Sequence, residues 1–251
     1  MSSGILIRWT LFIVSVVLFT IGNPGIGRAD EQSVHQLIAD AVNQFNTVED
    51  YTCRLDKTVR KGSVMYSDRD IAVKYKKPAH YYFRWNHGIA RGREVIFVHG
   101  KYNDKLVAHP GGIFKQMTLR LDPEGYLAMR ANRHSLKSSG MEKIIALISS
   151  NVALARSKGL DVIHYIGEAR FDGKPATVVE GRFPEEEGFY AHRIRLYFCP
   201  KVKLPLKVAI YNGSGELVEA YEFHDLKINV GLSDDDFDPH NPQYGYRHAG
   251  N

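Results

Sequence analysis

The chain has 251 residues, a formal net charge of +5 and two cysteines. This length fits one domain of generous size, which buries roughly 70% of its unfolded surface without needing disulfides or a metal for stability. Lys and Arg are scattered, with only short clusters such as those at residues 74–77 and 201–203. This pattern excludes the dense basic stripe of a nucleic-acid-binding protein. It is compatible with a weak preference for anionic lipid headgroups.

The N-terminal segment predicts export. An apolar run at residues 9–21 follows Arg8, and Gly27 and Ala29 put small residues where a signal peptidase reads them. The run is about 13 residues long, shorter than the ~20 that span a bilayer. We therefore expect a signal peptide at residues 1–29, cleaved after Ala29, and one periplasmic domain at residues 30–251. The alternative is an uncleaved anchor in the inner membrane.

The two cysteines, Cys53 and Cys199, predict one disulfide if the chain folds in an oxidising compartment. The bond would close a loop of about 145 residues and contribute on the order of 5 kcal/mol. Two separate buried thiols are the alternative, because a sequence does not show whether the two Cβ atoms approach each other.

Hydrophobic periodicity predicts a mostly β chain with two helices. Ser33 caps a helix with one apolar stripe from Val34 to Phe45, and Ser139 with Glu142 forms a capping-box pair before a wide apolar helix that extends to Leu154. Alternation and turn residues predict strands at residues 51–59, 71–75, 81–85, 95–99, 105–108, 114–121, 162–166, 176–180, 192–198, 206–211 and 217–224. The tail, residues 232–246, reads as an irregular lacing segment.

Consecutive antiparallel hairpins with few helices indicate an α+β, mostly β fold. We expect a large curved antiparallel sheet, an open half-barrel of about ten or eleven strands. The N-terminal helix and the inserted mid-chain helix should cover this sheet.

Catalytic and metal-binding motifs fail on their spacing. Residues 167–174 resemble a phosphate loop, but Pro175 stands where Ser or Thr is needed. Residues 234–245 resemble a calcium loop, but Pro239 and Gly245 occupy the positions of its Gly and its bidentate Glu. The histidines lack metal-ligand spacing, although His99 and His109 could meet across a hairpin. We expect no catalytic residue, no metal and no cofactor, and hence no enzyme.

Apolar side chains exceed what a two-layer core needs. A strongly curved sheet does not fill its concave side with its own side chains, so these residues could line a cavity for an apolar ligand. The simpler alternative is that they are core beneath the helices. The cavity candidates are Tyr81, Phe83, Trp85, Val95, Phe97, Ile144, Ile148, Ile194, Leu196 and Phe198.

The arrangement of the whole mature chain resembles the LolA-like group of periplasmic carriers. The tail carries the resemblance at residues 223–229 (FHDLKIN) and 237–239 (FDP). An uncharacterised bacterial family within this group is the closer match, through Lys77-Pro78, residues 92–95 (GREV), residues 121–123 (LDP) and residues 241–245 (NPQYG). The resemblance spans roughly residues 48–246 and implies an open half-barrel closed by helices over a hydrophobic cavity.

The resemblance implies two functions. The first is a periplasmic carrier or chaperone that shields a lipid or the acyl chains of a lipoprotein. The second is a periplasmic sensor or regulatory domain that binds lipid or peptide and acts on a membrane partner. The expected partners are a lipid or an acylated protein, with an envelope membrane protein as a further partner, and the chain is expected to be a monomer. No individual ligand-binding position carries over from the group.

Overall fold

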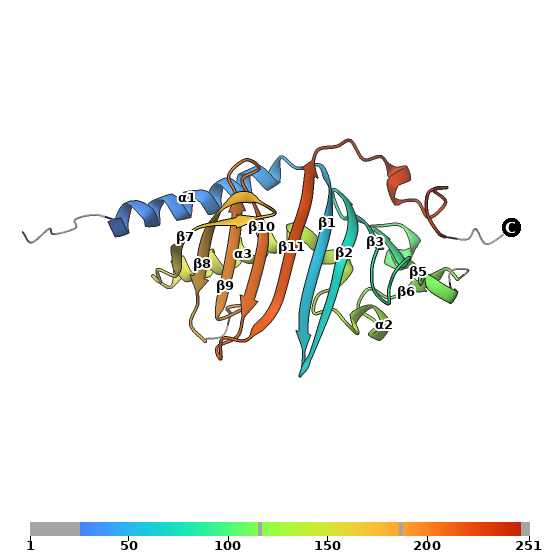
Figure 1. The fold of residues 1–251 in the computed structure, drawn as a ribbon, viewed down its shortest axis with the longest axis horizontal. Coiled ribbons are helices and arrows are strands. Elements are labelled where there is room, and N and C mark those ends of the chain that lie inside the picture. The colour runs from blue at the N-terminus through green and yellow to red at the C-terminus, as the bar shows by residue number, and fades with distance from the viewer. Residues whose placement is uncertain (1–25, 115–116, 186–187, 247–251) are drawn as a thin grey trace, which may run out of the picture.

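The computed structural model describes residues 26–114, 117–185 and 188–246, so the predicted signal peptide lies largely outside the described part. Eleven strands form one antiparallel sheet in the order β6-β5-β4-β3-β2-β1-β11-β10-β9-β8-β7 (Figure 1). The strands are β1 (Asp50–Lys61), β2 (Val64–Lys76), β3 (His80–Trp85), β4 (Glu94–Val98), β5 (Leu106–His109), β6 (Leu119–Leu121), β7 (Ile163–Phe171), β8 (Lys174–Arg182), β9 (Arg193–Cys199), β10 (Leu204–Tyr211) and β11 (Leu217–Ile228). The sheet is curved and open, which confirms the predicted fold class.

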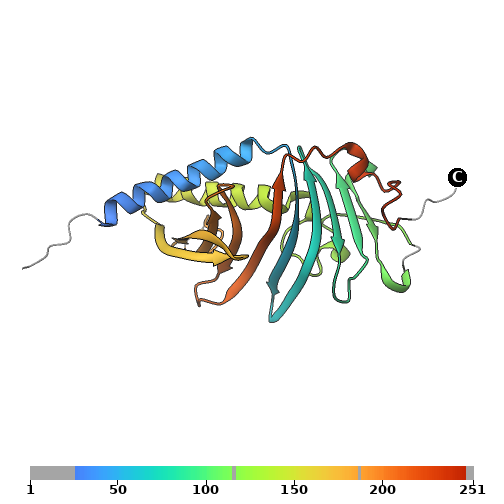
Figure 2. The same ribbon diagram turned by 45° about the horizontal axis from the view of Figure 1, so that its top comes forward.

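Three α-helices and four 3₁₀ segments complete the fold. The helices are α1 (Ile26–Asn46), α2 (Tyr126–Met129) and α3 (Gly140–Ser157), and the short segments are η1 (Tyr102–Asp104), η2 (Gly112–Phe114), η3 (Leu136–Ser138) and η4 (Asp234–Phe237). The helices α1 and α3 run side by side against one face of the sheet (Figure 2). We call this the inner face. Among the described residues, no helix is long and apolar enough to cross a membrane.

The helix α1 begins at Ile26, earlier than the Ser33 cap expected from the sequence. The residues before Ser33 are Asp, Glu and Gln, which can all continue a helix. The predicted cleavage point after Ala29 therefore lies inside α1. A chain cleaved there would begin with Asp30 and Glu31, and acidic side chains stabilise the positive N-terminal end of a helix.

One continuous core fills the space between the inner face and the two helices. From α1 it receives Val34, Ile38, Ala41 and Phe45, the stripe predicted from the sequence. On the sheet side, Tyr81 pairs with Phe97 and Phe83 with Val95 across β3 and β4, so the two predicted apolar faces become one surface. Across this core, α1 contacts α3, β7 and β10.

The tail packs on the outer face of the sheet. Phe237 and Tyr246 join Tyr82, Ile96 and Val107 in a second, smaller core, and the Tyr244 ring stacks on Tyr82 with 4.2 Å between centroids. The Asp50 carboxylate accepts hydrogen bonds from the backbone N–H groups of residues 230, 231 and 232, at 2.6 to 3.1 Å. The tail, predicted as a lacing segment at residues 232–246, thus covers the outer face of strands β2 to β5.

The predicted disulfide is wrong in this structure, because Cys53 and Cys199 are both free, buried thiols. Cys53 is in β1 and Cys199 ends β9, and the strands β11 and β10 lie between them. Three strand spacings amount to about 14 Å along the sheet, and a disulfide requires Cα atoms within about 7 Å. Burial raises the pKa of the Cys53 thiol, which keeps it protonated and unreactive.

Two motifs of the family resemblance serve the packing of the loops and the tail. Glu94 is buried and accepts a hydrogen bond from the Gly245 backbone N–H at 2.8 Å. A Cβ atom at Gly245 would lie 2.7 Å from His109 Nε2. The residues 92–95 and 241–245 are therefore neighbours in space, and they fix the tail to the sheet.

Glycine is required where the loops after β3 and β5 touch. A Cβ on Gly111 would lie 2.5 Å from the Gly92 carbonyl carbon, whereas a Cβ on Gly100 would meet nothing within 4 Å, although both have φ near +75°. Gly100→Ala should therefore cost only the strain of a left-handed Ala, about 1 kcal/mol. We expect Gly111→Ala to cost roughly 1–3 kcal/mol more in urea unfolding. Equal losses would contradict this close contact.

Candidate functional site at the mouth of the half-barrel

The ten cavity candidates all lie on the inner face or on the side of α3 that faces it. Every one of them is buried, and every one belongs to the main core. Tyr81 stacks on Phe83 at 5.9 Å between centroids, and Phe83 lies 6.3 Å from Trp85. The structure thus brings the candidates together. Phe83 and Trp85 also line a small pocket.

Hydrogen bonds fasten the N-terminus of α3 to this aromatic surface. The Tyr51 hydroxyl accepts from the Met141 backbone N–H at 3.2 Å, and Tyr81 and Tyr75 donate to the Glu142 carboxylate at 2.9 and 3.3 Å. Glu142 therefore does not form the predicted capping box, and the Ser139 side chain makes no cap hydrogen bond. Burial raises the pKa of the Tyr81 hydroxyl, so Tyr81 stays protonated and donates to the Glu142 carboxylate.

The segment before α3 covers the mouth of the half-barrel. We call residues 122–139 the cover; it contains α2 and η3. Apart from Pro123, no side chain described in the cover is buried. Polar contacts attach it to β1 instead. Lys57 Nζ donates to Asn132 Oδ1 at 2.7 Å, and Lys61 Nζ donates to the Met129 carbonyl at 2.5 Å.

Glu219 in β11 is the centre of the attachment. Its side chain is fully buried, and both oxygens accept hydrogen bonds. Arg133 Nε and His134 Nε2 of the cover lie 2.9 and 3.3 Å from the carboxylate. Tyr221 donates to it at 2.6 Å, and the Tyr190 hydroxyl donates as well. Burial alone would raise the pKa of Glu219, but the hydrogen bonds from His134, Tyr190 and Tyr221 lower it to about 2.

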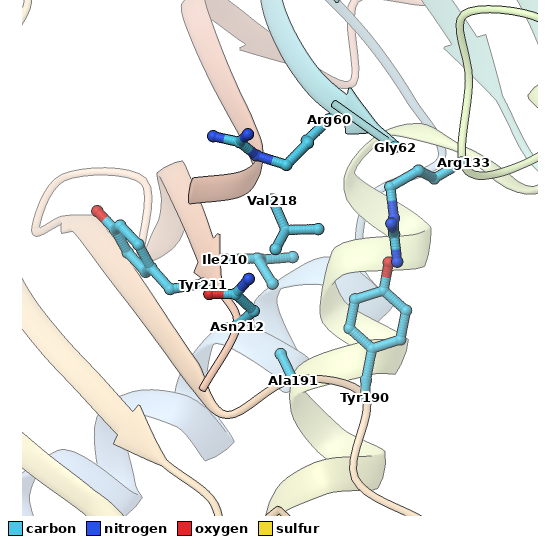
Figure 3. Close-up of a pocket in the computed structure, with 9 residues that line it drawn as sticks. All are labelled: Arg60, Gly62, Arg133, Tyr190, Ala191, Ile210, Tyr211, Asn212 and Val218. Atoms are coloured by element: carbon cyan, nitrogen blue, oxygen red, sulfur yellow. The ribbon is translucent and has the colours of Figure 1, made fainter. Parts of the chain in front are cut away.

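Two pockets adjoin this network, and Arg133 lines both. The larger, of about 290 Å³, lies outside the cover between Arg60, Asn212 and Tyr190 (Figure 3). The smaller, of about 40 Å³, lies beneath the cover against Leu55, Ile71, Phe83 and Trp85. Trp85 Nε1 is buried and has no hydrogen-bond partner in the described part of the chain. A largely apolar recess lined by Trp85 is therefore separated by Arg133 from a larger pocket of mixed polar and apolar lining.

Sequence reasoning missed Glu219, Arg133 and Tyr190. One signal was available for Glu219. Glu219, Tyr221 and Phe223 are two residues apart along β11, so their side chains share one face of the strand. The sequence therefore puts a charged residue at a core-facing position. No comparable signal exists for Arg133 or Tyr190, because both lie on irregular segments whose place against the sheet depends on tertiary structure.

Neither metal alternative is supported by the described residues. His99 follows the end of β4 and His109 pairs with Glu94 at its start, so the two lie at opposite ends of the hairpin. Asp234 and Asp236 instead form ion pairs with Lys76 and Lys74 at 2.9 and 2.6 Å. Within residues 26–114, 117–185 and 188–246, no three His, Cys, Asp or Glu side chains gather as metal ligands would.

Comparisons with known proteins give one family and a set of remote structural likenesses. The family model DUF1571, described as a protein of unknown function, matches residues 48–246. No curated protein matches the chain in sequence. The solved structures described next share 12–15% sequence identity with this chain.

The solved structures include a mycobacterial lipoprotein, a protein described as a LolA superfamily protein and a MucA/MucB complex. The lipoprotein LppX of Mycobacterium tuberculosis aligns with a TM-score of 0.48 and 12% identity, over 80% of this chain and 98% of LppX. A LolA superfamily protein of Nitrosomonas europaea aligns with a TM-score of 0.34 and 12% identity, over 82% and 97%. The MucA/MucB complex of Pseudomonas aeruginosa contains a chain that aligns with a TM-score of 0.38 and 15% identity, over 79% and 60%.

The low pKa of Glu219 predicts a pH dependence of folding. A carboxyl group whose pKa falls from 4.5 to about 2 on folding stabilises the native state by about 3 kcal/mol above pH 5. That contribution is lost as the pH falls from about 5 to 2. The difference in unfolding free energy between wild type and Glu219→Gln should therefore shrink across this range.

The Tyr221→Phe variant removes one donor to the carboxylate. It should raise the pKa of Glu219 and move the loss of stability to higher pH. A difference between wild type and Glu219→Gln that stays constant from pH 6 to pH 2 would refute the role of these hydrogen bonds.

Proposed function

The chain belongs to the DUF1571 family, and we propose that it is an exported carrier that takes an apolar or amphipathic ligand beneath the cover. The observation that carries the proposal is the contrast between the two sides of the recess. Its floor is an aromatic and aliphatic surface on the sheet, whereas its cover is attached through Lys57, Lys61 and Glu219. Hydrogen bonds to charged groups contribute a net of about 1.5–3 kcal/mol each. The cover adds only partly buried apolar side chains to the core, among them Ala128 and Leu136, so it can lift with little loss of apolar packing.

The recess must enlarge to hold a ligand. Its 40 Å³ lies well below the roughly 300–1,000 Å³ of a typical ligand pocket. An acyl chain that lay on Phe83 and Trp85 would displace the part of the cover that lies between Asn132 and Leu136. The unpaired Trp85 Nε1 could then donate to a carbonyl or carboxylate oxygen of the ligand. Apolar burial at about 25 cal/mol per Å² would supply the affinity.

A regulatory domain is the second candidate, and the outer pocket favours it. The pocket is open, and its lining includes Arg60, Asn212 and two tyrosines, which suits a peptide or a polar headgroup better than an acyl chain. In this role, occupation of the outer pocket would act through Arg133 on the cover. The two candidates differ in where the ligand binds.

Tryptophan fluorescence separates them. The sequence holds two tryptophans, Trp9 and Trp85, so a chain cleaved after Ala29 retains Trp85 alone. We expect a brominated fatty acid to quench its fluorescence saturably, and an unbrominated one to compete. Phe83→Leu should weaken binding about 4- to 15-fold, because it removes one to two methylene equivalents of apolar contact.

The matched control is Phe171→Leu, which makes the same change at a buried core position outside the recess. It should lower stability by a similar amount and leave the affinity unchanged. Equal affinities for both variants, or no quenching at all, would reject the carrier and leave the regulatory domain as the better proposal.

Export is the second part of the proposal. Protein recovered from the periplasmic fraction should have an intact mass that begins at Asp30, since Gly27 and Ala29 define the cleavage site. An Ala29→Gln variant should accumulate as the precursor, because a large side chain does not fit the peptidase. Full-length protein found only in membranes would replace the cleaved carrier with an anchored one.

A further inference from the structure

Exposed apolar side chains gather at one end of the sheet. In the antiparallel order, the turn after β1, the loop after β3 and the loop after β5 all lie at this end, and Lys61 ties α2 to it (Figures 1 and 2). Seven of the eleven large exposed apolar residues in the described part of the chain belong to these segments. We call this surface the apolar rim, with Met65, Ile89, Phe114, Met117, Tyr126 and Leu127 as its principal members.

The exposure of these side chains is high. Tyr126 and Leu127 on α2 are 78% and 64% exposed, and Ile89 is fully exposed. Residues with so little contact contribute nothing to the core, so packing does not explain their apolar character. Single exposed apolar residues are ordinary on a protein surface, but a group around one opening marks an interaction surface.

The charged side chains of these segments are all basic, whereas the neighbouring loop after β10 carries Glu216, which lies 3.9 Å from Arg60. Among the described residues of 60–65, 86–93, 110–118 and 126–134 there are six Lys or Arg and no Asp or Glu. Arg91 and Arg130 are exposed and form no ion pair with any described residue. The acidic residues 234–236 and 238 lie instead on η4 or directly after it, on the outer face. A rim that combines apolar tips with the two unpaired arginines matches an anionic lipid surface.

We propose that the apolar rim docks the protein on anionic bilayers, with Ile89, Tyr126 and Leu127 entering the interface and Arg91 and Arg130 contacting headgroup phosphates. The cover and the recess lie at the same end, so docking would turn the mouth of the half-barrel towards the membrane. The inference does not depend on the carrier function, because a docked regulatory domain would use the same rim.

Vesicle binding tests the proposal. The mature chain should sediment with phosphatidylcholine vesicles that contain 30% phosphatidylglycerol, and much less with phosphatidylcholine alone. Salt should weaken binding, because headgroup attraction is screened. Arg91→Gln and Arg130→Gln should each weaken binding about fivefold. The same vesicle assay with inorganic phosphate added at 10 mM should show little competition, since a free phosphate has no apolar interface to offer.

The apolar part of the rim is tested by a matched pair of substitutions. Ile89→Ser should weaken binding to the anionic vesicles roughly tenfold. Ile166→Ser makes the same change on β7, at an exposed position away from the rim, and should have no effect. Neither substitution removes core contacts, so both variants should fold like the wild type.

Three results would overturn the proposal: no binding to anionic vesicles at low salt, equal binding of the Ile89→Ser and Ile166→Ser variants, or an Ile89-dependent dimer in the absence of lipid. The last result would assign the rim to a second copy of the chain. Quenching of Trp85 by monomeric fatty acid should be unchanged in Ile89→Ser. Vesicle binding and ligand binding can therefore fail independently.

Discussion

The order of the strands imposes one constraint on the rest of the molecule. β6 and β7 follow each other in the chain, but they form opposite edges of the eleven-stranded sheet. The segment between them must cross the whole inner face. The first part of this crossing is the cover and the second is α3, whose buried residues from Met141 to Ala155 enter the core. The hollow of the half-barrel is thus filled by the connection that the topology requires.

The crossing segment is attached in two different ways. At Met141 and beyond, α3 combines apolar packing with the hydrogen bonds of Tyr51, Tyr75 and Tyr81, so its release would expose a large aromatic surface. The cover has almost no buried side chains and depends on Glu219 and the two lysines of β1. Because the hydrophobic effect scales with apolar area and polar contacts exchange with water, the cover is the part that can separate at lower cost. The boundary between the two parts lies at Gly140, where a Cβ atom would meet the Tyr51 hydroxyl at 2.5 Å.

The sequence predicted the sheet better than the site, and the reason is physical. Alternation along β3, β4 and β9 identifies the inward-facing aromatics directly, since successive side chains point to opposite faces. The first half of β2, residues 64–70, lacks that alternation because it extends as a ribbon with both faces partly in solvent. The expected strand at 114–121 shrinks to Leu119–Leu121, because β5 offers only three partners. Glu219 interrupts the run of apolar residues on the inward face of β11. An acidic residue buried at such a position makes it a candidate for a functional role.

The residues that carry the family resemblance pack the loops and the tail against the sheet. The resemblance therefore predicted the fold but not the function. Gly92, Glu94 and Gly245 join the loop after β3 to the tail on the outer face, away from the recess. Gly92 also touches Gly111, so the same contact sets the position of the two loops that carry Ile89 and Phe114. These residues therefore help to position the loops of the rim. The network at the mouth is built on Glu219 and Arg133, and neither belongs to the motifs that carry the family resemblance.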